Sequence, residues 1–454
     1  MSKHINMTQG KPLKLLVSFA IPLMFGNIFQ QLYTVVDTAI VGRGVGLDAL
    51  AALGSVDWLN WMVLGLAFGF TQGFSVRISQ KFGEGDMEGL KQIAGQSAFL
   101  SAAISVVSTL LVQLALPLIL TLLNVRDDLR GTATLYTRIL LGGMTASVFY
   151  NYCASVLRAV GDSRTPLVAM VVASVVNIAL DCVAVFLLGW GVAGAAAATV
   201  AAQCLAGVIC LWKIFATPGL RFGWKQVIPV WADCRDLLKI GTPIAAKNTV
   251  IAVGGMAIQS IVNGFSVSFI AGFIATNKLY GLLEIAAISY SYAVTTYVGQ
   301  NYGAGNFDRI RKGVRSATSL SLITSVVIAV VMLVFGRNII ALFISSEDPG
   351  MVAAATDTSY AYLCVMSAFL PVLYLLYVFL SALQGIGKTV STMVSGIIEL
   401  VSRVSFAVVV AWIGIEYLIF GAEVTAWLGA AIFLGVSYFL AMRKLDKSEQ
   451  RRSL

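Results

Sequence analysis

Twelve apolar stretches, each long enough to cross the hydrocarbon core of a membrane, divide the chain from end to end. A membrane-spanning helix needs about 20 mainly apolar residues. Only 12% of the residues are charged, whereas a soluble domain carries roughly 25%. The sequence therefore predicts an all-α integral membrane protein with twelve transmembrane helices. The expected spans are 13–41, 48–76, 92–116, 132–157, 165–188, 191–215, 237–263, 268–299, 316–336, 352–382, 389–413 and 418–441.

Lysine and arginine gather on one side of the membrane. When the residues near the span ends are counted with the adjoining loops, both termini and the loops after even-numbered spans hold 23 of the 31 Lys and Arg residues, the opposite loops hold five, and the interior of the spans holds three. Such an excess of positive charge marks the cytoplasmic side. We therefore expect both termini in the cytoplasm, and we read the net charge of +9 as a sign of orientation rather than of a nucleic-acid partner.

The chain repeats itself. Pro22 recurs as Pro243, and the turn Gln80–Asp86 recurs as Gln300–Asn306 at nearly the same offset. Each half holds six spans, so both halves start on the same side and are parallel repeats, related by a pseudo-two-fold axis along the membrane normal. The expected domains are an N-terminal six-helix bundle (1–217), a cytoplasmic linker (218–236) and a C-terminal six-helix bundle (237–454). Two such bundles suit alternating-access transport, although a duplication can also build a rigid scaffold.

Two acidic side chains inside apolar spans of the first half are candidates for a site. Asp37 lies near the outer end of the first span, and Asp181 lies near the outer end of the fifth. Asn177 is four residues before Asp181 and shares its helix face. Thr199 lies about as far after the short outer turn as Asp181 lies before it, so we expect all four side chains at one depth.

Two interpretations of these four residues stay open. Oxygen ligands of this kind suit a hard cation such as Na⁺, and a pair of carboxylates in a low dielectric can also hold a proton. Alternatively, each side chain bonds to a neighbouring helix and is inert, as Asn and Thr often do in membranes. An ionisable group within a span is costly, which favours a functional role for the aspartates. The only histidine, His4, lies in the N-terminal tail, so a proton path in the membrane would have to use carboxylates.

The second half carries a different set of charges within its spans or close to their ends. Glu399 and Arg403 are four residues apart and can neutralise each other on one helix face. Glu284 has a choice of basic partners in this half of the chain. A structural role for these groups and a role in gating or proton movement both stay open. The members of this charge network are Lys247, Lys278, Glu284, Glu399 and Arg403.

Pro22 lies within the first span. Proline removes one backbone hydrogen bond from a helix and often kinks it. A kink between the cytoplasmic end of this span and Asp37 could couple the state of the carboxyl group to bending of the helix.

The chain resembles the multidrug and toxic compound extrusion (MATE) family of cation-coupled exporters, and its acidic first half is most similar to the prokaryotic DinF-like branch. The resemblance covers nearly the whole chain. The segments that carry it are Ile21-Pro22, Val35-Val36-Asp37, Arg158–Pro166, Asn177–Asp181 and Gln300–Gly305.

This resemblance implies a secondary-active antiporter of a prokaryotic plasma (inner) membrane, which exports amphipathic, often cationic organic compounds in exchange for H⁺ or Na⁺. It implies a cation site at Asp37, Asn177, Asp181 and Thr199, and it makes Pro22 the bending proline. It also implies a first-half cavity lined by Gln30, Tyr33, Tyr136 and Asn151. We expect a monomer with no cofactor and no structural metal.

One departure from the family concerns the second half. In the branch named after a sodium-driven exporter, a glutamate stands near the repeat's proline in the seventh span. Lys247 and Asn248 occupy the nearby positions in this chain. The departure argues against a second-half sodium site and leaves the coupling ion open.

Two rival functions lead to different expectations for the sequence. A lipid-linked precursor flippase of the same superfamily would be expected to line its cavity with basic groups, whereas this first half offers acids. An intramembrane enzyme would need a reactive constellation, and the adjacent pair Asp127-Asp128 lies in an outer loop. Gly387-Lys388-Thr389 resembles the end of a phosphate-binding loop, but Ala382 stands where the first glycine should be. The sequence therefore predicts a transporter rather than an enzyme.

Overall fold

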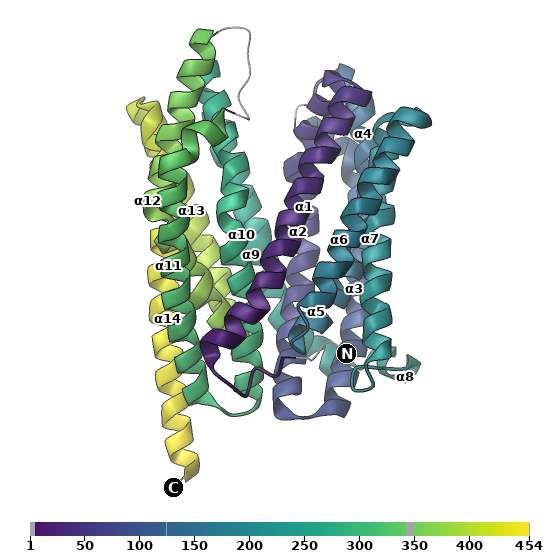
Figure 1. Ribbon diagram of the computed structural model, residues 1–454, viewed down its shortest axis with the longest axis vertical. Helices are drawn as coiled ribbons and strands as arrows, with labels where there is room; N and C mark the ends of the chain where they lie inside the picture. Colours follow the sequence, from purple (N-terminus) through teal and green to yellow (C-terminus); the bar gives the residue numbers. More distant parts are fainter. Residues whose placement is uncertain (1–4, 124, 342–348, 454) are drawn as a thin grey trace. The chain divides into compact units, whose positions relative to one another are not determined.

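A computed structural model describes residues 5–123, 125–341 and 349–453 as helices joined by short loops (Figure 1). Twelve helical segments in these ranges are long and apolar enough to cross a membrane, which confirms the predicted fold class. His4 lies outside the described residues. In chain order the helices are α1 (Pro12–Gly44), α2 (Leu47–Glu84), α3 (Met87–Leu122), α4 (Asp127–Gly142), α5 (Met144–Ala159), α6 (Arg164–Asp181), the π-helix η1 (Cys182–Leu187), α7 (Gly191–Ala216), α8 (Trp224–Val227), α9 (Trp231–Val262), α10 (Val267–Gly303), α11 (Phe307–Ile340), α12 (Pro349–Gly385), α13 (Thr389–Ile413), the 3₁₀-helix η2 (Glu416–Phe420) and α14 (Gly421–Ser453).

The chain forms two compact units. Unit 1 comprises Met1–Gln9 and Ile21–Thr249, and unit 2 comprises Gly10–Ala20 and Val250–Leu454. The boundaries between the units therefore fall inside α1, beside Pro22, and inside α9. The division into two six-helix bundles at residues 218–236 describes the repeats, and it stays a prediction.

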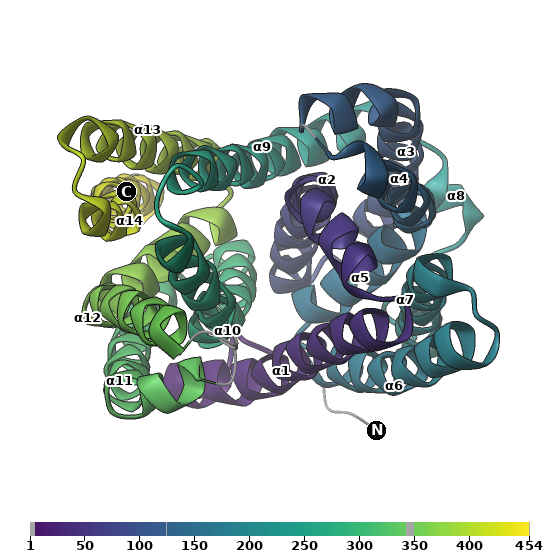
Figure 2. The same cartoon turned by 90° about the horizontal axis from the view of Figure 1, so that it is seen from above.

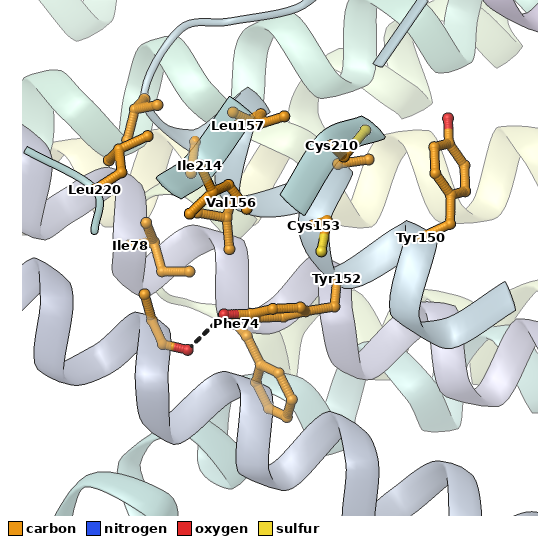
Figure 3. Close-up of a cluster of buried hydrophobic side chains, with 14 of the residues drawn as sticks. Phe74, Ile78, Tyr150, Tyr152, Cys153, Val156, Leu157, Cys210, Ile214 and Leu220 are labelled. Atoms are coloured by element: carbon orange, nitrogen blue, oxygen red, sulfur yellow. Dashed lines mark hydrogen bonds between the residues drawn. The ribbon is translucent and has the colours of Figure 1, made fainter. Parts of the chain in front are cut away.

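The first unit is built around α5, which packs against α2, α3 and α7. Twelve of its sixteen residues, among them Cys153 and Leu157, are buried. Tyr152 is buried as well, and its hydroxyl donates a hydrogen bond to the Ala94 carbonyl at 2.8 Å, which satisfies the one polar atom of that ring (Figure 3). Small residues on α7, such as Ala206 and Cys210, let the two helices approach closely, as is common in membrane bundles.

The second unit is held together by α12, which packs against α10, α11 and α14. Aromatic rings join these helices to η2: Tyr362 stacks on Phe273 at 4.9 Å and on Phe420 at 4.7 Å between ring centroids. Near them, α13 and α14 lie side by side (Figure 2). Rings at this separation add to the energy of burial, so the stack fixes η2 against the unit.

Matched turns in the two halves share one backbone conformation. Gly85 and Gly305, in the repeated turn, have φ of 75° and 70°, and Gly161 and Gly387 have φ of 89° and 80°. Glycine enters this left-handed region without the steric penalty that other residues meet. The repeat read from the sequence thus has a counterpart in the backbone, at the positions where a helix must end sharply.

Glycines on α2 bring this helix into backbone contact with the first part of α9. A Cβ added to Gly69 would lie 2.5 Å from the Cα of Ala245, and one added to Gly73 would lie 2.4 Å from the Cα of Gly241. One turn away, the Asn248 side-chain amide donates to the Gly65 carbonyl at 2.8 Å. These contacts explain why α9 as far as Thr249 belongs to unit 1.

The variant Gly73→Ala should therefore destabilise the protein. Its new methyl group meets backbone atoms, which cannot turn aside as a side chain can, so we expect a loss of about 1–3 kcal/mol. Thermal unfolding of the purified protein in detergent measures it. Gly131→Ala is the matched control, because a Cβ there meets open space and alanine favours a helix. Equal melting temperatures for both variants would contradict this account of the crossing.

Candidate functional site

The first-half aspartates lie on α1 and α6 of unit 1. Asp37 stands seven residues before Gly44, the last residue of α1, which places it roughly 10 Å from that helix end. Asp181 is the last residue of α6. Asp181 is 0% exposed, Asn177 is 1% exposed, and Asp37 is half-buried. The two carboxyl groups are direct electrostatic neighbours.

Neither carboxyl group is neutralised by a basic side chain. None of the ion pairs between described residues involves Asp37 or Asp181. Oδ1 of Asp37, both Oδ atoms of Asp181 and both polar side-chain atoms of Asn177 are buried without a hydrogen-bond partner among the described residues. Buried polar groups are normally hydrogen-bonded. Such a cluster of unsatisfied oxygens, with two acids in contact, is a place that a proton or a small cation would stabilise.

The backbone changes its helical form directly after Asp181. The π-helix η1 runs over Cys182–Leu187 and leads into the turn around Gly189, whose φ is 64°. A π-turn inserted in a membrane helix is rare and is found often at functional sites. The span predicted over 165–188 is continuous, because hydropathy carries no signal for a change from α to π hydrogen bonding.

A small cavity lies between α1, α6 and α7, with Asn177 of the oxygen cluster in its wall. It offers about 10 Å³ to the centre of a water-sized sphere, which is roughly the space for one water molecule. Thr199 lies in its wall and gives its hydroxyl hydrogen to the Ala195 carbonyl at 3.1 Å, so its oxygen keeps lone pairs for a further donor or cation. The lining residues are Tyr33, Met170, Ala173, Ser174, Asn177, Thr199, Ala202 and Gln203.

Ser174 and Gln203 are part of this wall and are not among the site residues predicted from the sequence. Ser174 lies three residues before Asn177, and Gln203 lies four residues after Thr199, so helical spacing from the predicted residues could have found both. Oε1 of Gln203 is a buried acceptor without a hydrogen-bond partner among the described residues. Its position adds one more oxygen to the side of the cavity formed by α7.

The expected cavity residues lie at different distances from the acids. Tyr33 and Tyr136 are half-buried, and both are electrostatic neighbours of Asp37 and Asp181. Gln30 is exposed. Asn151 donates to the Ser147 carbonyl of its own helix at 3.0 Å, and no contact ties it to the acids. The two tyrosines therefore belong to the site by position, and the roles of Gln30 and Asn151 stay predictions.

The second-half charges fall into separate places. Lys247 is buried in the part of α9 that belongs to unit 1, and Lys278 is exposed on α10. Glu284 accepts hydrogen bonds from the hydroxyls of Tyr280 and Tyr377, the latter at 2.9 Å. Only basic partners are predicted for Glu284 from the sequence, because a pattern of charges does not include tyrosines: Tyr280 lies four residues earlier on the same helix, and Tyr377 lies on α12.

Arg403 forms its ion pair with Glu423 of α14, at 2.7 Å, and this partner is not among those predicted from the sequence. Glu399 acts on Arg403 electrostatically from its own helix, less strongly than Glu423 does. Arg403 and Glu399 are each 5% exposed. A cation between two acids thus links α13 to α14 inside unit 2.

The oxygen cluster of unit 1 has the chemistry of a light-cation site rather than of a transition-metal site. Among the described residues, no three His, Cys, Asp or Glu side chains gather as a metal site would need. The donors present are two carboxylates with amide and hydroxyl oxygens, which fit a proton or Na⁺.

Comparison with known proteins agrees with this architecture. The sequence profile of the MatE family matches residues 22–183 and 243–409. The probable multidrug resistance protein YpnP of Bacillus subtilis is 30% identical over 414 residues, which cover 91% of this chain and 92% of that protein. DNA damage-inducible protein F of Escherichia coli is 27% identical over 449 residues, covering 95% of this chain and 90% of that protein.

Solved structures share the fold. A MOP superfamily transporter from Pyrococcus furiosus matches with a TM-score of 0.91 at 24% sequence identity, over 98% of this chain and 99% of that one. A crystal structure of MATE in complex with MaL6 also gives a TM-score of 0.91 at 24% identity, over 98% of this chain and 100% of that one. With twelve candidate spans, two repeated halves and a family profile that matches most of its length, the chain belongs to the MATE family of multi-pass membrane transporters and is not an enzyme.

Proposed function

We propose that this protein is a secondary-active multidrug efflux antiporter, which exports amphipathic, often cationic organic compounds in exchange for H⁺ or Na⁺. One observation carries the proposal: Asp37 and Asp181, on two different membrane-spanning helices, adjoin each other without a neutralising base among the described residues. Two adjacent acids held in lipid are costly, and a cation or a proton removes that cost. The relatives named as multidrug resistance proteins support the substrate class.

The coupling follows from competition for this site. With both carboxylates charged, unit 1 presents a negative surface beside the rings of Tyr33 and Tyr136, and an organic cation is attracted to such a surface. When a proton or Na⁺ loads the pair, this attraction falls and the substrate leaves. Ion loading and substrate binding then favour different arrangements of unit 1, which is the differential affinity that a population shift requires.

Pro22 gives α1 a place to bend while this exchange occurs. The proline stands beside the point where α1 passes from unit 2 to unit 1, and it removes a backbone hydrogen bond there. The variant Pro22→Ala should restore that bond, stiffen α1 and slow efflux by roughly 5- to 20-fold, within the range of energetic couplings between sites. Stopped-flow dye efflux measures the rate, and an unchanged rate would remove the bending hypothesis.

The orientation of the chain in the membrane is part of the proposal. The excess of basic residues supports both termini in the cytoplasm, and the bacterial relatives support a prokaryotic plasma membrane. Asp37 and Asp181 then lie in the outer half of the membrane, where they can load from outside. Accessibility of single cysteines placed in the loops tests this orientation. We expect one chain to suffice, because all the proposed site residues belong to unit 1 of the same molecule.

The experiment that tests the function is dye efflux from proteoliposomes, with the pH gradient and the sodium gradient dissipated one at a time. If dissipating one of the two gradients stops efflux, the ion of that gradient is the coupling ion. If neither gradient drives any dye, the antiport proposal fails. If the protein instead moves a lipid-linked precursor across the membrane of the same vesicles, the alternative function as a flippase is favoured.

A further inference from the structure

The segment between α7 and α9 exposes large apolar side chains next to basic ones. Trp224 and Trp231 are 82% and 75% exposed, and Ile228 is 55% exposed. Arg221 and Lys225 are exposed too, and neither takes part in an ion pair between described residues. We call these five residues the linker patch. Exposed apolar surface bordered by charge is typical of a site that meets a membrane or another protein.

The backbone of this segment is fixed to α3. The Gln96 side chain of α3 is 0% exposed, and its amide nitrogen donates to the carbonyls of Gln226 and Ile228 at 2.6 and 2.7 Å. Its Oε1 accepts from the Val230 N–H at 2.8 Å. A Cβ on Gly95 would lie 2.4 Å from the Gln226 carbonyl oxygen, so the close approach requires glycine there. The linker patch is therefore carried on a segment with a defined place on α3.

The helix that holds the segment faces lipid. Leu110, Leu114 and Leu118 of α3 are 57%, 80% and 64% exposed, and apolar side chains exposed along a membrane span meet hydrocarbon. α8 packs against α3, and both views show α8 at the edge of unit 1 (Figures 1 and 2). The linker patch thus belongs to the side of unit 1 that lipid covers.

The depth of the segment corresponds to the membrane interface. The apolar stretch predicted for α3 begins at residue 92, and Gln96 lies about one helical turn inside it. The hydrogen bonds of Gln96 therefore hold residues 226–230 where hydrocarbon gives way to headgroups. Tryptophan is enriched at this level of a membrane, and lysine and arginine there attract anionic lipids. A lipid surface accordingly suits both the apolar and the basic members of the linker patch.

We propose that the linker patch binds the surface of the bilayer, with Trp224, Ile228 and Trp231 inserted among the headgroups and Arg221 and Lys225 paired with anionic lipids. The segment is then an anchor that holds this end of unit 1 at one depth, rather than a passive connection between the two halves. This role requires the membrane fold but not ion-coupled antiport.

Tryptophan fluorescence of the full-length protein in nanodiscs tests the insertion. Subtracting the signal of Trp224→Phe/Trp231→Phe from that of the wild type isolates the two rings, and their exposure makes the exchange harmless to the fold. Lipids brominated near the headgroup should quench this difference signal more than lipids brominated near the chain end, and aqueous iodide should quench it least. Quenching by iodide without quenching by the shallow bromine would overturn the proposal.

A lipid titration in detergent tests the charges. In the wild type, brominated phosphatidylglycerol should quench the two rings at lower concentration than brominated phosphatidylcholine. Arg221→Gln/Lys225→Gln should raise the half-saturating concentration of phosphatidylglycerol by about 5-fold for each charge removed and should leave that of phosphatidylcholine unchanged.

The matched control is Lys312→Gln/Arg315→Gln, which removes two exposed charges from α11 of unit 2 and should change neither concentration. Equal half-saturating concentrations of the two lipids in the wild type would overturn the pairing with anionic lipids. Neither measurement requires transport, so failure of the antiport proposal would leave both of them decisive.

Discussion

Asp37→Asn and Asp181→Asn should each abolish ion-coupled efflux while leaving the protein folded. Asparagine keeps the shape of aspartate but cannot take up a proton and binds Na⁺ less tightly, so the ion no longer favours one arrangement of unit 1. Couplings between two binding sites typically amount to about 5- to 150-fold, and loss of that factor should reduce efflux to the passive leak. Dye efflux from proteoliposomes under an imposed ion gradient measures it.

The double variant makes this prediction sharper. If Asp37 and Asp181 bind the ion together, Asp37→Asn/Asp181→Asn should be no worse than either single change, because residues that act as a unit are not additive. Asp128→Asn is the control: its carboxylate is exposed and pairs with Arg126 at 2.7 Å, away from the site, and efflux should be normal. Wild-type rates in both single variants would remove the coupling role of the pair.

The fold was predictable because the bilayer restricts which sequences and which secondary structures can cross it. A backbone in hydrocarbon must satisfy its hydrogen bonds internally, so each long apolar stretch becomes a helix. The helix ends were less predictable. α2 continues to Glu84 and α10 to Gly303, well past the apolar stretches at 48–76 and 268–299, because a helix that leaves the hydrocarbon can carry polar residues without cost.

The interior breaks were not predictable from hydropathy. The expected fourth span is divided at Gly143 into α4 and α5. A Cβ on Gly143 would lie 2.2 Å from the side chain of Val200, so packing against α7 demands glycine at this point. The change to π hydrogen bonding after Asp181 was not predictable either, because hydropathy does not report which carbonyl each N–H meets.

Helical spacing was enough to predict that the acids of the first half lie near one another. Counting residues from the outer turns placed Asp37, Asn177 and Asp181 near one depth, and the structure makes the two acids neighbours. Helical spacing cannot predict which side chain on another helix will be the partner of a given residue. Glu423 beside Arg403, and Tyr377 beside Glu284, depend on how α10, α12, α13 and α14 are rotated against one another, and a single sequence does not carry that information.

Arg403→Met should be the most destabilising change in unit 2. Arg403 is buried between Glu423, its ion-pair partner at 2.7 Å, and Glu399, a second source of negative charge. Removing one partner of a buried ion pair leaves an uncompensated charge and costs about 3–5 kcal/mol. We expect a lower melting temperature in detergent and less folded monomer on size-exclusion chromatography.

Compensating variants decide between the two interpretations that the sequence left open for this network. Arg403→Met/Glu423→Gln removes both members of the ion pair, and replacing a buried ion pair by neutral groups is often nearly neutral for stability. If the network only joins α13 to α14, this double variant should recover most of the lost stability and should also recover efflux. If the charges take part in gating, the double variant should be stable but should not transport. A double variant as unstable as Arg403→Met would instead show that Glu399, and not Glu423, is the charge that Arg403 has to balance.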